Sequence, residues 1–210
     1  PCTLFVQGDA RLSLERILET LDGEEREETK FTTQIAKVKE KSRTSLRATL
    51  GPYEEIMDAL RISLDREAIF IRDVTISNST WGNRLFEIYE PRTSVHAVGG
   101  GIGQGLQMAI GAKAAEPMKQ VVAVCGDGGL FVNLGEMATA TQENLPIVLV
   151  VFNDRGYGVI RNIQHAGYEG RVFGVDLEQP DFLELATSRE MKQQLFARIF
   201  RLVADHFERI

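Results

Sequence analysis

The sequence predicts an α/β protein built on a parallel β-sheet with helices on both faces. Two β-branched apolar segments, Val121–Cys125 and Ile147–Phe152, flank a segment of helical spacing, Leu134–Glu143. Strands that are apolar throughout are typical of parallel sheets covered on both faces, and a helix between two of them completes a βαβ unit. Such crossovers are right-handed, so both strands end at the same edge of the sheet. Open α/β sheets bind their ligands at that edge.

The N-terminal quarter of the chain predicts one short strand and a series of helices. Residues 1–8 are interpreted as a strand that ends in a turn, and Ala10–Leu21 as an amphipathic helix. Asp22–Leu50 carries mixed charge with sparse apolar positions, which is typical of an exposed helical linker. After Gly51 and Pro52, Tyr53–Leu64 has the spacing of a further amphipathic helix.

The next segments predict a strand, a polar turn and a helix. Glu67–Asp73 is a strand that ends in an acid; Asp73 is interpreted as a turn cap, with a ligand role as the alternative. Thr75–Glu90 is a polar turn followed by a short helix around Trp81, which we expect to be buried with its N–H hydrogen-bonded. Leu106–Ala115 follows a glycine-rich loop and predicts a helix.

Glycines and carboxylates follow both strands of the βαβ unit. Asp127 lies in the sequence Gly126-Asp127-Gly128-Gly129, and Asp154 lies in the second loop, which ends at Gly158. Glycines let backbone N–H groups approach an anion such as phosphate. Two carboxylates would repel that phosphate unless a cation lay between them, and Mg²⁺ prefers such a mixed oxygen environment. The unit therefore predicts a metal–diphosphate site, with a backbone carbonyl near Gly156 as a third protein ligand.

These residues resemble the thiamine diphosphate motif, in which GDG is followed, after a spacer of this size, by Asn-Asn. The flanking sequences are similar to the diphosphate-binding domain of acetohydroxyacid synthase and benzoylformate decarboxylase relatives: Gly135-Glu136-Met137-Ala138-Thr139, Leu145-Pro146 and Gly156-Tyr157-Gly158. The resemblance covers about residues 51–186. One position departs from the pattern, because Asp154 stands where the family has its second Asn, so the preference for a particular metal is open.

The resemblance implies a set of cofactor-binding residues. They are Gly101, Ile102, Gly103, Gly126, Asp127, Gly128, Gly129, Asp154, Gly156, Tyr157 and Gly158. Of these, Asp127, Asp154 and the Gly156 carbonyl are expected to hold Mg²⁺. Ile102 falls where the family keeps a bulky apolar residue beneath the thiazolium ring, with ordinary core packing as the alternative.

Three further residues are candidates for a substrate pocket. His96 is either a strand-end residue or a group lining the active site. Arg161 could anchor a substrate, and His165 could carry a proton because the pKa of histidine lies near neutrality. Arg161 and His165 have surface positions as their alternative.

The C-terminal part departs from the family pattern. A helix is predicted over residues 182–186, capped by the sequence before it, and Ala186 then runs directly into Thr187. This junction is either a deletion or the place of a missing loop, and the final strand of the family is not found. We therefore predict four parts: residues 1–22 as a remnant of a preceding middle domain, 23–50 as the linker, 51–186 as the cofactor domain, and 187–210 as an amphipathic helix.

Composition excludes several classes of protein. The 210 residues are 43% hydrophobic and carry a formal net charge of −6, which argues against a nucleic-acid surface. Two cysteines are too few for a disulfide framework, and Cys125 is interpreted as a small core residue rather than a nucleophile. The sequence shows neither a signal peptide nor an apolar segment of spanning length, so we expect a cytoplasmic protein without a membrane partner.

The resemblance implies a function in 2-oxo acid chemistry. Thiamine diphosphate is an electron sink for decarboxylation or carboligation of a 2-oxo acid, as in acetolactate synthase. The family's activating glutamate comes from another domain of a partner subunit, so we expect this chain to be inactive alone. A homodimer or homotetramer, or a separate pyrimidine-domain subunit, is implied. The alternatives are a non-catalytic binding or assembly module and a general α/β nucleotide-phosphate binder.

Overall fold

The computed structural model describes residues 4–22 and 30–187 and divides the chain into two compact units. The first, Pro1–Thr44, holds helix α1 (Ala10–Leu21) and most of helix α2 (Lys30–Arg47). Both helices form where the sequence predicts them, and Asp9 caps α1 by accepting the Leu12 N–H at 3.0 Å. The predicted N-terminal strand is wrong within the described residues, since 4–9 form no strand.

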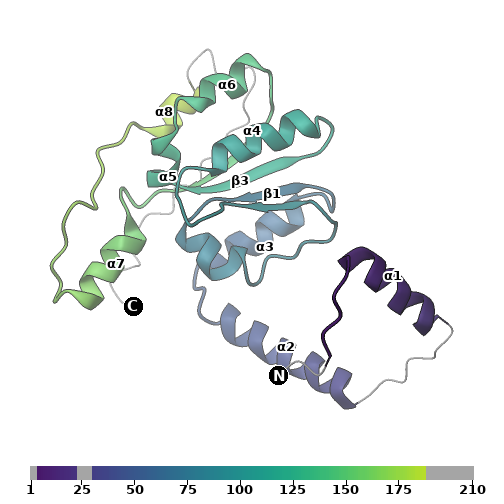
Figure 1. The fold of residues 1–210 in the computed structure, drawn as a ribbon. Coiled ribbons are helices and arrows are strands. Elements are labelled where there is room, and N and C mark those ends of the chain that lie inside the picture. The colour runs from purple at the N-terminus through teal and green to yellow at the C-terminus, as the bar shows by residue number, and fades with distance from the viewer. Residues whose placement is uncertain (1–3, 23–29, 188–210) are drawn as a thin grey trace. The chain divides into compact units, whose positions relative to one another are not determined.

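The second unit, Ser45–Ile210, is built on a four-stranded parallel sheet (Figure 1). Its strands are β1 (Ile69–Arg72), β2 (Ser94–His96), β3 (Val121–Gly126) and β4 (Val148–Phe152), in the order β2-β1-β3-β4. Every neighbouring pair is parallel, and the β3–β4 register aligns Gly126 with Phe152. The predicted parallel sheet is therefore confirmed, and the strands preceding Asp127 and Asp154 are neighbours.

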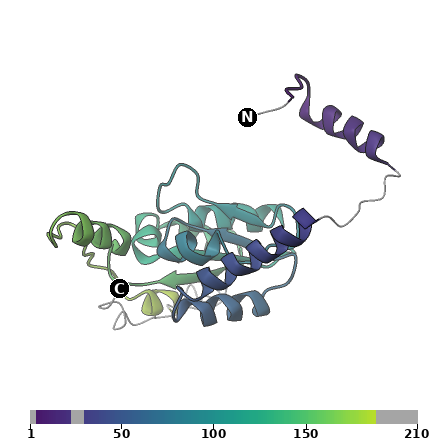
Figure 2. The ribbon, with the colours of Figure 1, turned by 90° about the horizontal axis from the view of Figure 1, so that it is seen from below.

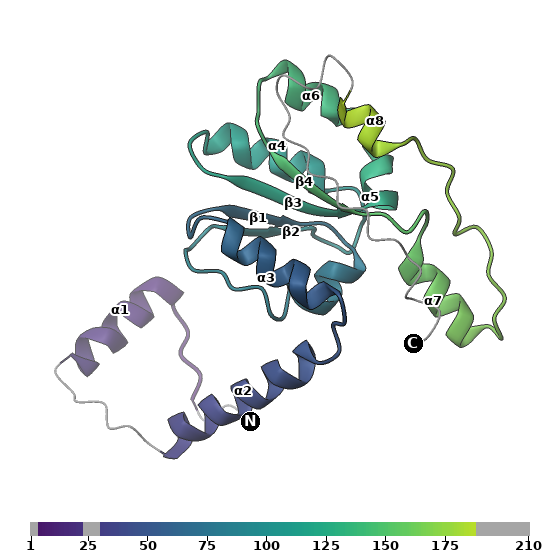
Figure 3. The ribbon, with the colours of Figure 1, turned by 180° about the vertical axis from the view of Figure 1, so that it is seen from behind.

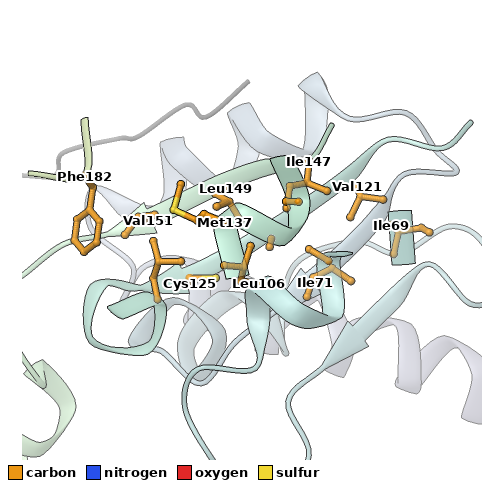
Figure 4. Close-up of a cluster of buried hydrophobic side chains, with 14 residues drawn as sticks. Ile69, Ile71, Leu106, Val121, Cys125, Met137, Ile147, Leu149, Val151 and Phe182 are labelled. Carbon is orange, nitrogen blue, oxygen red and sulfur yellow. The ribbon is translucent and has the colours of Figure 1, made fainter. Parts of the chain in front are cut away.

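Helices cover both faces of this sheet. Figure 3 shows α4 (Gly105–Ala115) and α6 (Glu136–Gln142) on one face and α3 (Tyr53–Ser63) on the other. Side chains alternate between the faces along each strand. The α4 face buries one alternate set together with Met137 and Phe182, the latter from α8 (Phe182–Thr187), as Figure 4 shows. The α3 face buries the other set with Trp81 and Phe86.

The segment after β3 differs from the prediction. The sequence predicts a turn at residues 126–129 and one helix at 134–143, whereas the structure has α5 (Asp127–Val132) and then the shorter α6. Glycine disfavours a helix, but Leu130 at 3% exposure packs in the core and holds the turn after β3 in helical form. Helix packing therefore overrides the local preference here.

The segment around Trp81 partly confirms its prediction. It forms a π-helix, η1 (Asn78–Gly82), and Trp81 is fully buried, as expected. Its indole N–H has no hydrogen-bond partner among the described residues, so the expectation of a satisfied N–H is wrong. Trp81 is instead held by aromatic packing, with Phe86 at 6.0 Å and Phe152 at 6.3 Å between ring centroids.

Helix α7 (Gly158–Gly167) follows β4 and lies beyond the carboxyl ends of the strands (Figure 2). The chain then returns to α8, where Asp181 accepts the Glu184 N–H at 3.1 Å and so caps the helix as predicted. The predicted amphipathic helix over residues 187–210 lies outside the described residues except for Thr187, which ends α8. Among the helices that are described, none is both long enough and apolar enough to cross a membrane.

Candidate functional site

A cavity of about 250 Å³ opens at the carboxyl edge of the sheet, between the loops that follow β1, β3 and β4. The parallel register places the ends of β3 and β4 side by side. The loops that follow these two strands, although distant in sequence, therefore form one wall of the cavity. Nine of the expected cofactor residues line this cavity: Ile102, Gly126, Asp127, Gly128, Gly129, Asp154, Gly156, Tyr157 and Gly158. The cavity is thus formed by both glycine-rich segments together.

Asp127 is a buried carboxylate whose orientation is fixed by two donors. Its side chain is 2% exposed, and its Oδ2 accepts the Gly156 N–H at 2.9 Å and the Gln179 Nε2–H at 2.8 Å. A buried carboxylate needs such charge-assisted hydrogen bonds to offset the loss of hydration. Asp127 therefore ties the loop after β3 to the loop after β4.

Asp154 lies against Asp127, and its pKa is raised to about 6. Burial is the main cause, and the neighbouring negative charge and hydrogen bond of Asp127 add to it, while Arg161 acts in the opposite direction. Two adjacent carboxylates repel each other when both are ionised, unless a cation lies between them. The arrangement is therefore an electrostatic site for a cation that can displace a proton.

Gly158 is required by the close approach of Asp154. A Cβ at this position would overlap the Asp154 Oδ2, so any other side chain at the start of α7 would displace the carboxylate. Gly156 is enclosed in the same way, because a Cβ there would overlap the Val175 carbonyl oxygen and lie 2.6 Å from the Arg161 guanidinium. Gly158 thus lets the backbone approach the Asp154 carboxylate, and Gly156 lets it approach Val175 and Arg161.

The residues present fit a cation bound to a diphosphate. In residues 4–22 and 30–187, no three His, Cys, Asp or Glu side chains come together as metal ligands. A cation between Asp127 and Asp154 would take its remaining ligands from backbone carbonyl and phosphate oxygens, which suits Mg²⁺. The first N–H groups of α5 have no partner within the helix and belong to residues that line the cavity, so donors for phosphate oxygens are at hand.

Five of the residues singled out by the sequence do not line the cavity. Gly101 and Gly103 lie beside it, and Gly103 donates its N–H to Asp73 at 3.1 Å. His96 ends β2 with an exposed side chain, and His165 is exposed in the last turn of α7. Arg161 forms an ion pair with Asp176, with 2.7 Å between Nη2 and Oδ1. These positions place His96, Arg161 and His165 outside the cavity.

Asp73 and Cys125 have the structural roles that the sequence favours. Asp73 is 1% exposed and caps two loops, accepting N–H groups from Val74 at 2.7 Å and from Gly103 at 3.1 Å. Cys125 is fully buried in the core between the sheet and α4. Burial, with a smaller contribution from Asp73, raises the pKa of the Cys125 thiol. A thiol in this position is unreactive.

Tyr53 and Gln179 are among the residues at the site that sequence reasoning missed. Tyr53 of α3 lines the cavity, and its ring lies 5.5 Å from that of Phe152. Burial and then the charge of Asp154 raise the pKa of Tyr53. Gln179 reaches Asp127 from 52 residues along the chain. No local pattern marks either residue, although Gln179 lies just before a Pro-Asp helix start.

The chain is similar to known thiamine diphosphate proteins. Residues 75–209 match the family described as thiamine pyrophosphate enzyme, C-terminal TPP binding domain. A probable 2-ketoarginine decarboxylase of Pseudomonas aeruginosa is 31% identical over 184 residues, covering 87% of this chain and 33% of its own length. A probable acetolactate synthase large subunit of Methanococcus aeolicus is 27% identical over 206 residues, covering 89% of this chain and 34% of its own.

A solved structure shares the fold. The thiamine diphosphate-dependent 4-hydroxybenzoylformate decarboxylase of Rhodococcus jostii superposes with a TM-score of 0.57 at 26% identity, covering 63% of this chain and 25% of that one. The chain thus spans about a third of the length of the curated relatives above. The family match includes both carboxylates of the cavity and more than half of the chain. The chain therefore belongs to the thiamine pyrophosphate enzyme family and carries its C-terminal cofactor-binding domain.

Proposed function

We propose that this chain is the cofactor-binding portion of a thiamine diphosphate- and Mg²⁺-dependent enzyme that acts on a 2-oxo acid. The observation that carries the proposal is the pair of adjacent carboxylates, Asp127 and Asp154, in a glycine-lined cavity at the sheet edge. Relatives named as acetolactate synthases and 2-oxo acid decarboxylases support the reaction class, either carboligation or decarboxylation.

Each part of the cavity has a proposed role. Asp127, Asp154 and the Gly156 carbonyl would hold the cation, and Gly126, Gly128 and Gly129 would approach the diphosphate. Ile102, with Gly101 and Gly103 in the same loop, would support the thiazolium side; Ile102 is 38% exposed at the cavity wall, unlike a core residue. When bound, thiamine diphosphate supplies an electron sink for cleavage next to a carbonyl group.

Cation binding at the carboxylate pair is coupled to the loss of a proton. At neutral pH the raised pKa of Asp154 keeps a small fraction of the pair protonated, and an incoming cation removes that proton because it stabilises both ionised forms. The two hydrogen bonds to Asp127 hold that carboxylate in place through the exchange. Cation binding should therefore strengthen as the pH rises through about 6.

Substrate and partner extend the proposal beyond this chain. We infer a cytoplasmic assembly in which another domain, from a second copy or a separate subunit, supplies the glutamate that activates the cofactor. His96, Arg161 and His165 lie outside the cavity, so a role in substrate binding would place that part of the substrate beyond it. Whether the product is an acyloin or an aldehyde depends on residues outside this domain.

Cofactor binding tests the proposal directly. Calorimetric titration of the protein with thiamine diphosphate should show binding that requires Mg²⁺ and that Asp127→Ala abolishes, because the variant removes a buried ligand. Asp65→Ala, which removes an exposed acid remote from the cavity, is the matched control and should bind normally. ATP and NAD serve as control ligands. Tight nucleotide binding without thiamine diphosphate binding would contradict the proposal.

A further inference from the structure

The segment after α7 returns to the proposed cation loop and pairs with it. Tyr157 donates its N–H to the Val175 carbonyl at 2.8 Å, and Leu177 donates to the Arg155 carbonyl at 3.2 Å. Gly156 and Asp176 form an antiparallel bridge between these bonds, and Val175 is 1% exposed. This bridge and the burial of Val175 therefore fix the register of residues 175–177 against the loop that carries Gly156.

This register delivers Gln179 to Asp127. The Gln179 Nε2 lies 2.8 Å from the Asp127 Oδ2, and the same oxygen accepts the Gly156 N–H at 2.9 Å. Two donors on one oxygen fix the rotation of a carboxylate more firmly than one donor can. Gln179 does not line the cavity, so it acts on the site through its hydrogen bond to Asp127.

The unpaired oxygen of the Gln179 amide indicates that this side chain does more than stabilise the fold. Its Oε1 is buried and has no hydrogen-bond partner in the described part of the chain. An unpaired buried acceptor is destabilising, so the packing alone would favour an apolar side chain of the same length. The hydrogen bond to Asp127 is what the amide provides that such a side chain cannot.

We propose that Gln179 is a positioning residue that holds Asp127 in the orientation needed to bind the cation of a cation–diphosphate ligand. The inference rests on the proposed function, because it assigns Asp127 to that cation. Partners of metal-binding side chains of this kind change metal affinity by about 10- to 100-fold when they are removed. The effect reaches the cation only through Asp127.

The test compares variants of two glutamines that contact the segment after α7 or belong to it, Gln164 and Gln179. Gln179→Met removes the donor to Asp127 and keeps the side-chain length. Gln164→Met is the matched control, since Gln164 holds the segment through hydrogen bonds with the Phe173 carbonyl at 3.1 Å and N–H at 3.0 Å and does not contact Asp127. Affinity for Mn²⁺, a spectroscopic substitute for Mg²⁺, is measured by electron paramagnetic resonance with saturating thiamine diphosphate, and Tm is measured without ligands.

The two variants should separate stability from affinity. We expect Gln179→Met to weaken Mn²⁺ binding about 10- to 100-fold with little change in Tm, because loss of the donor and loss of the unpaired acceptor offset each other. Gln164→Met should lower Tm and leave Mn²⁺ affinity within about twofold of the wild type. Gln179→Asn, which keeps the amide but is one methylene shorter, should weaken binding like Gln179→Met.

Three results would overturn the inference. Gln179→Met could bind Mn²⁺ as tightly as the wild type, Gln164→Met could lose affinity equally, or the loss of affinity in Gln179→Met could follow a matching loss of Tm. If the wild-type protein bound neither thiamine diphosphate nor Mn²⁺, the proposed function itself would be wrong. That result differs from the three above, in which the wild type binds both ligands.

Discussion

At the residue scale, the site is governed by the contact between Asp127 and Asp154. Burial and mutual repulsion raise the pKa of Asp154 to about 6, while Asp127 holds two donors on its Oδ2. The Asn that the family has at position 154 would carry no such charge. Asp154 therefore lowers the stability of the unliganded folded protein and increases its electrostatic attraction for a cation.

Replacing Asp154 by Asn should stabilise the unliganded protein at neutral pH. The folded-state pKa of about 6 lies above the ordinary 3.8, so the unfavourable contribution is fully present above pH 6 and absent below pH 3.8. We expect Asp154→Asn to raise the free energy of unfolding by about 1–2 kcal/mol at pH 7, after discounting for partial solvation. Urea unfolding at pH 7 and at pH 4 measures this; an equal gain at both values would refute the electrostatic explanation.

At the scale of elements, helix α4 and the segment of residues 175–177 position the loops that form the cavity. Helix α4 packs Leu106 and Ala109 directly on the sheet, at 2% and 0% exposure. Its first residue, Gly105, lies so close to β3 that a Cβ would be 2.6 Å from the Cys125 Sγ and 3.0 Å from the Asp73 Cβ. Asp73 in turn caps the loop that holds Ile102. The close helix–strand contact therefore sets the position of that wall of the cavity.

Gly105→Ala should destabilise the domain because its Cβ has no room between α4 and β3. The expected loss in the free energy of unfolding is about 1–3 kcal/mol, typical of overpacking in a core. Gly111→Ala in the same helix is the control, since no atom lies within 4 Å of its Cβ. Alanine is the better helix former, so that variant should gain about 0.5–1 kcal/mol. Urea unfolding of both variants measures the difference, and equal stabilities would contradict the packing argument.

At the scale of the whole molecule, the proposed function separates cofactor binding from turnover. The cavity holds groups suited to a cation and a diphosphate, and the described residues place no His or Arg candidate for the substrate in its wall. The chain spans 33% and 34% of the length of two relatives. We therefore expect this chain to bind the cofactor without catalysing turnover.

The isolated 210-residue chain should bind thiamine diphosphate with Mg²⁺ and release no CO₂ from pyruvate or benzoylformate. Binding stabilises the folded state by mass action, by about 2.7 kcal/mol when the free ligand is at 100 times its Kd. A thermal shift with Mg²⁺ and the cofactor together, and with neither alone, checks binding. A CO₂-release assay checks turnover, and measurable decarboxylation by the isolated chain would contradict the prediction.

The sequence by itself determined the elements that carry the site. Apolar β-branched segments and helical spacing predicted β3, β4 and α4 closely, because these elements depend on the local pattern of burial. Placement of Asp127 and Asp154 together followed from the parallel crossover rule alone. Where glycines suggested a turn, at the start of α5, local preference gave the wrong answer because burial of Leu130 outweighs it.

Only the tertiary structure decided which distant side chains complete the site and which are excluded from it. Gln179 meets Asp127 across 52 residues because a return segment pairs with the loop after β4, and no periodicity encodes that register. The position of α3 brings Tyr53 to the cavity, and the ion pair with Asp176 holds Arg161 beside Gly156 but out of the cavity wall. Local sequence fixes where a strand ends, whereas the neighbours of that end depend on how the whole chain packs.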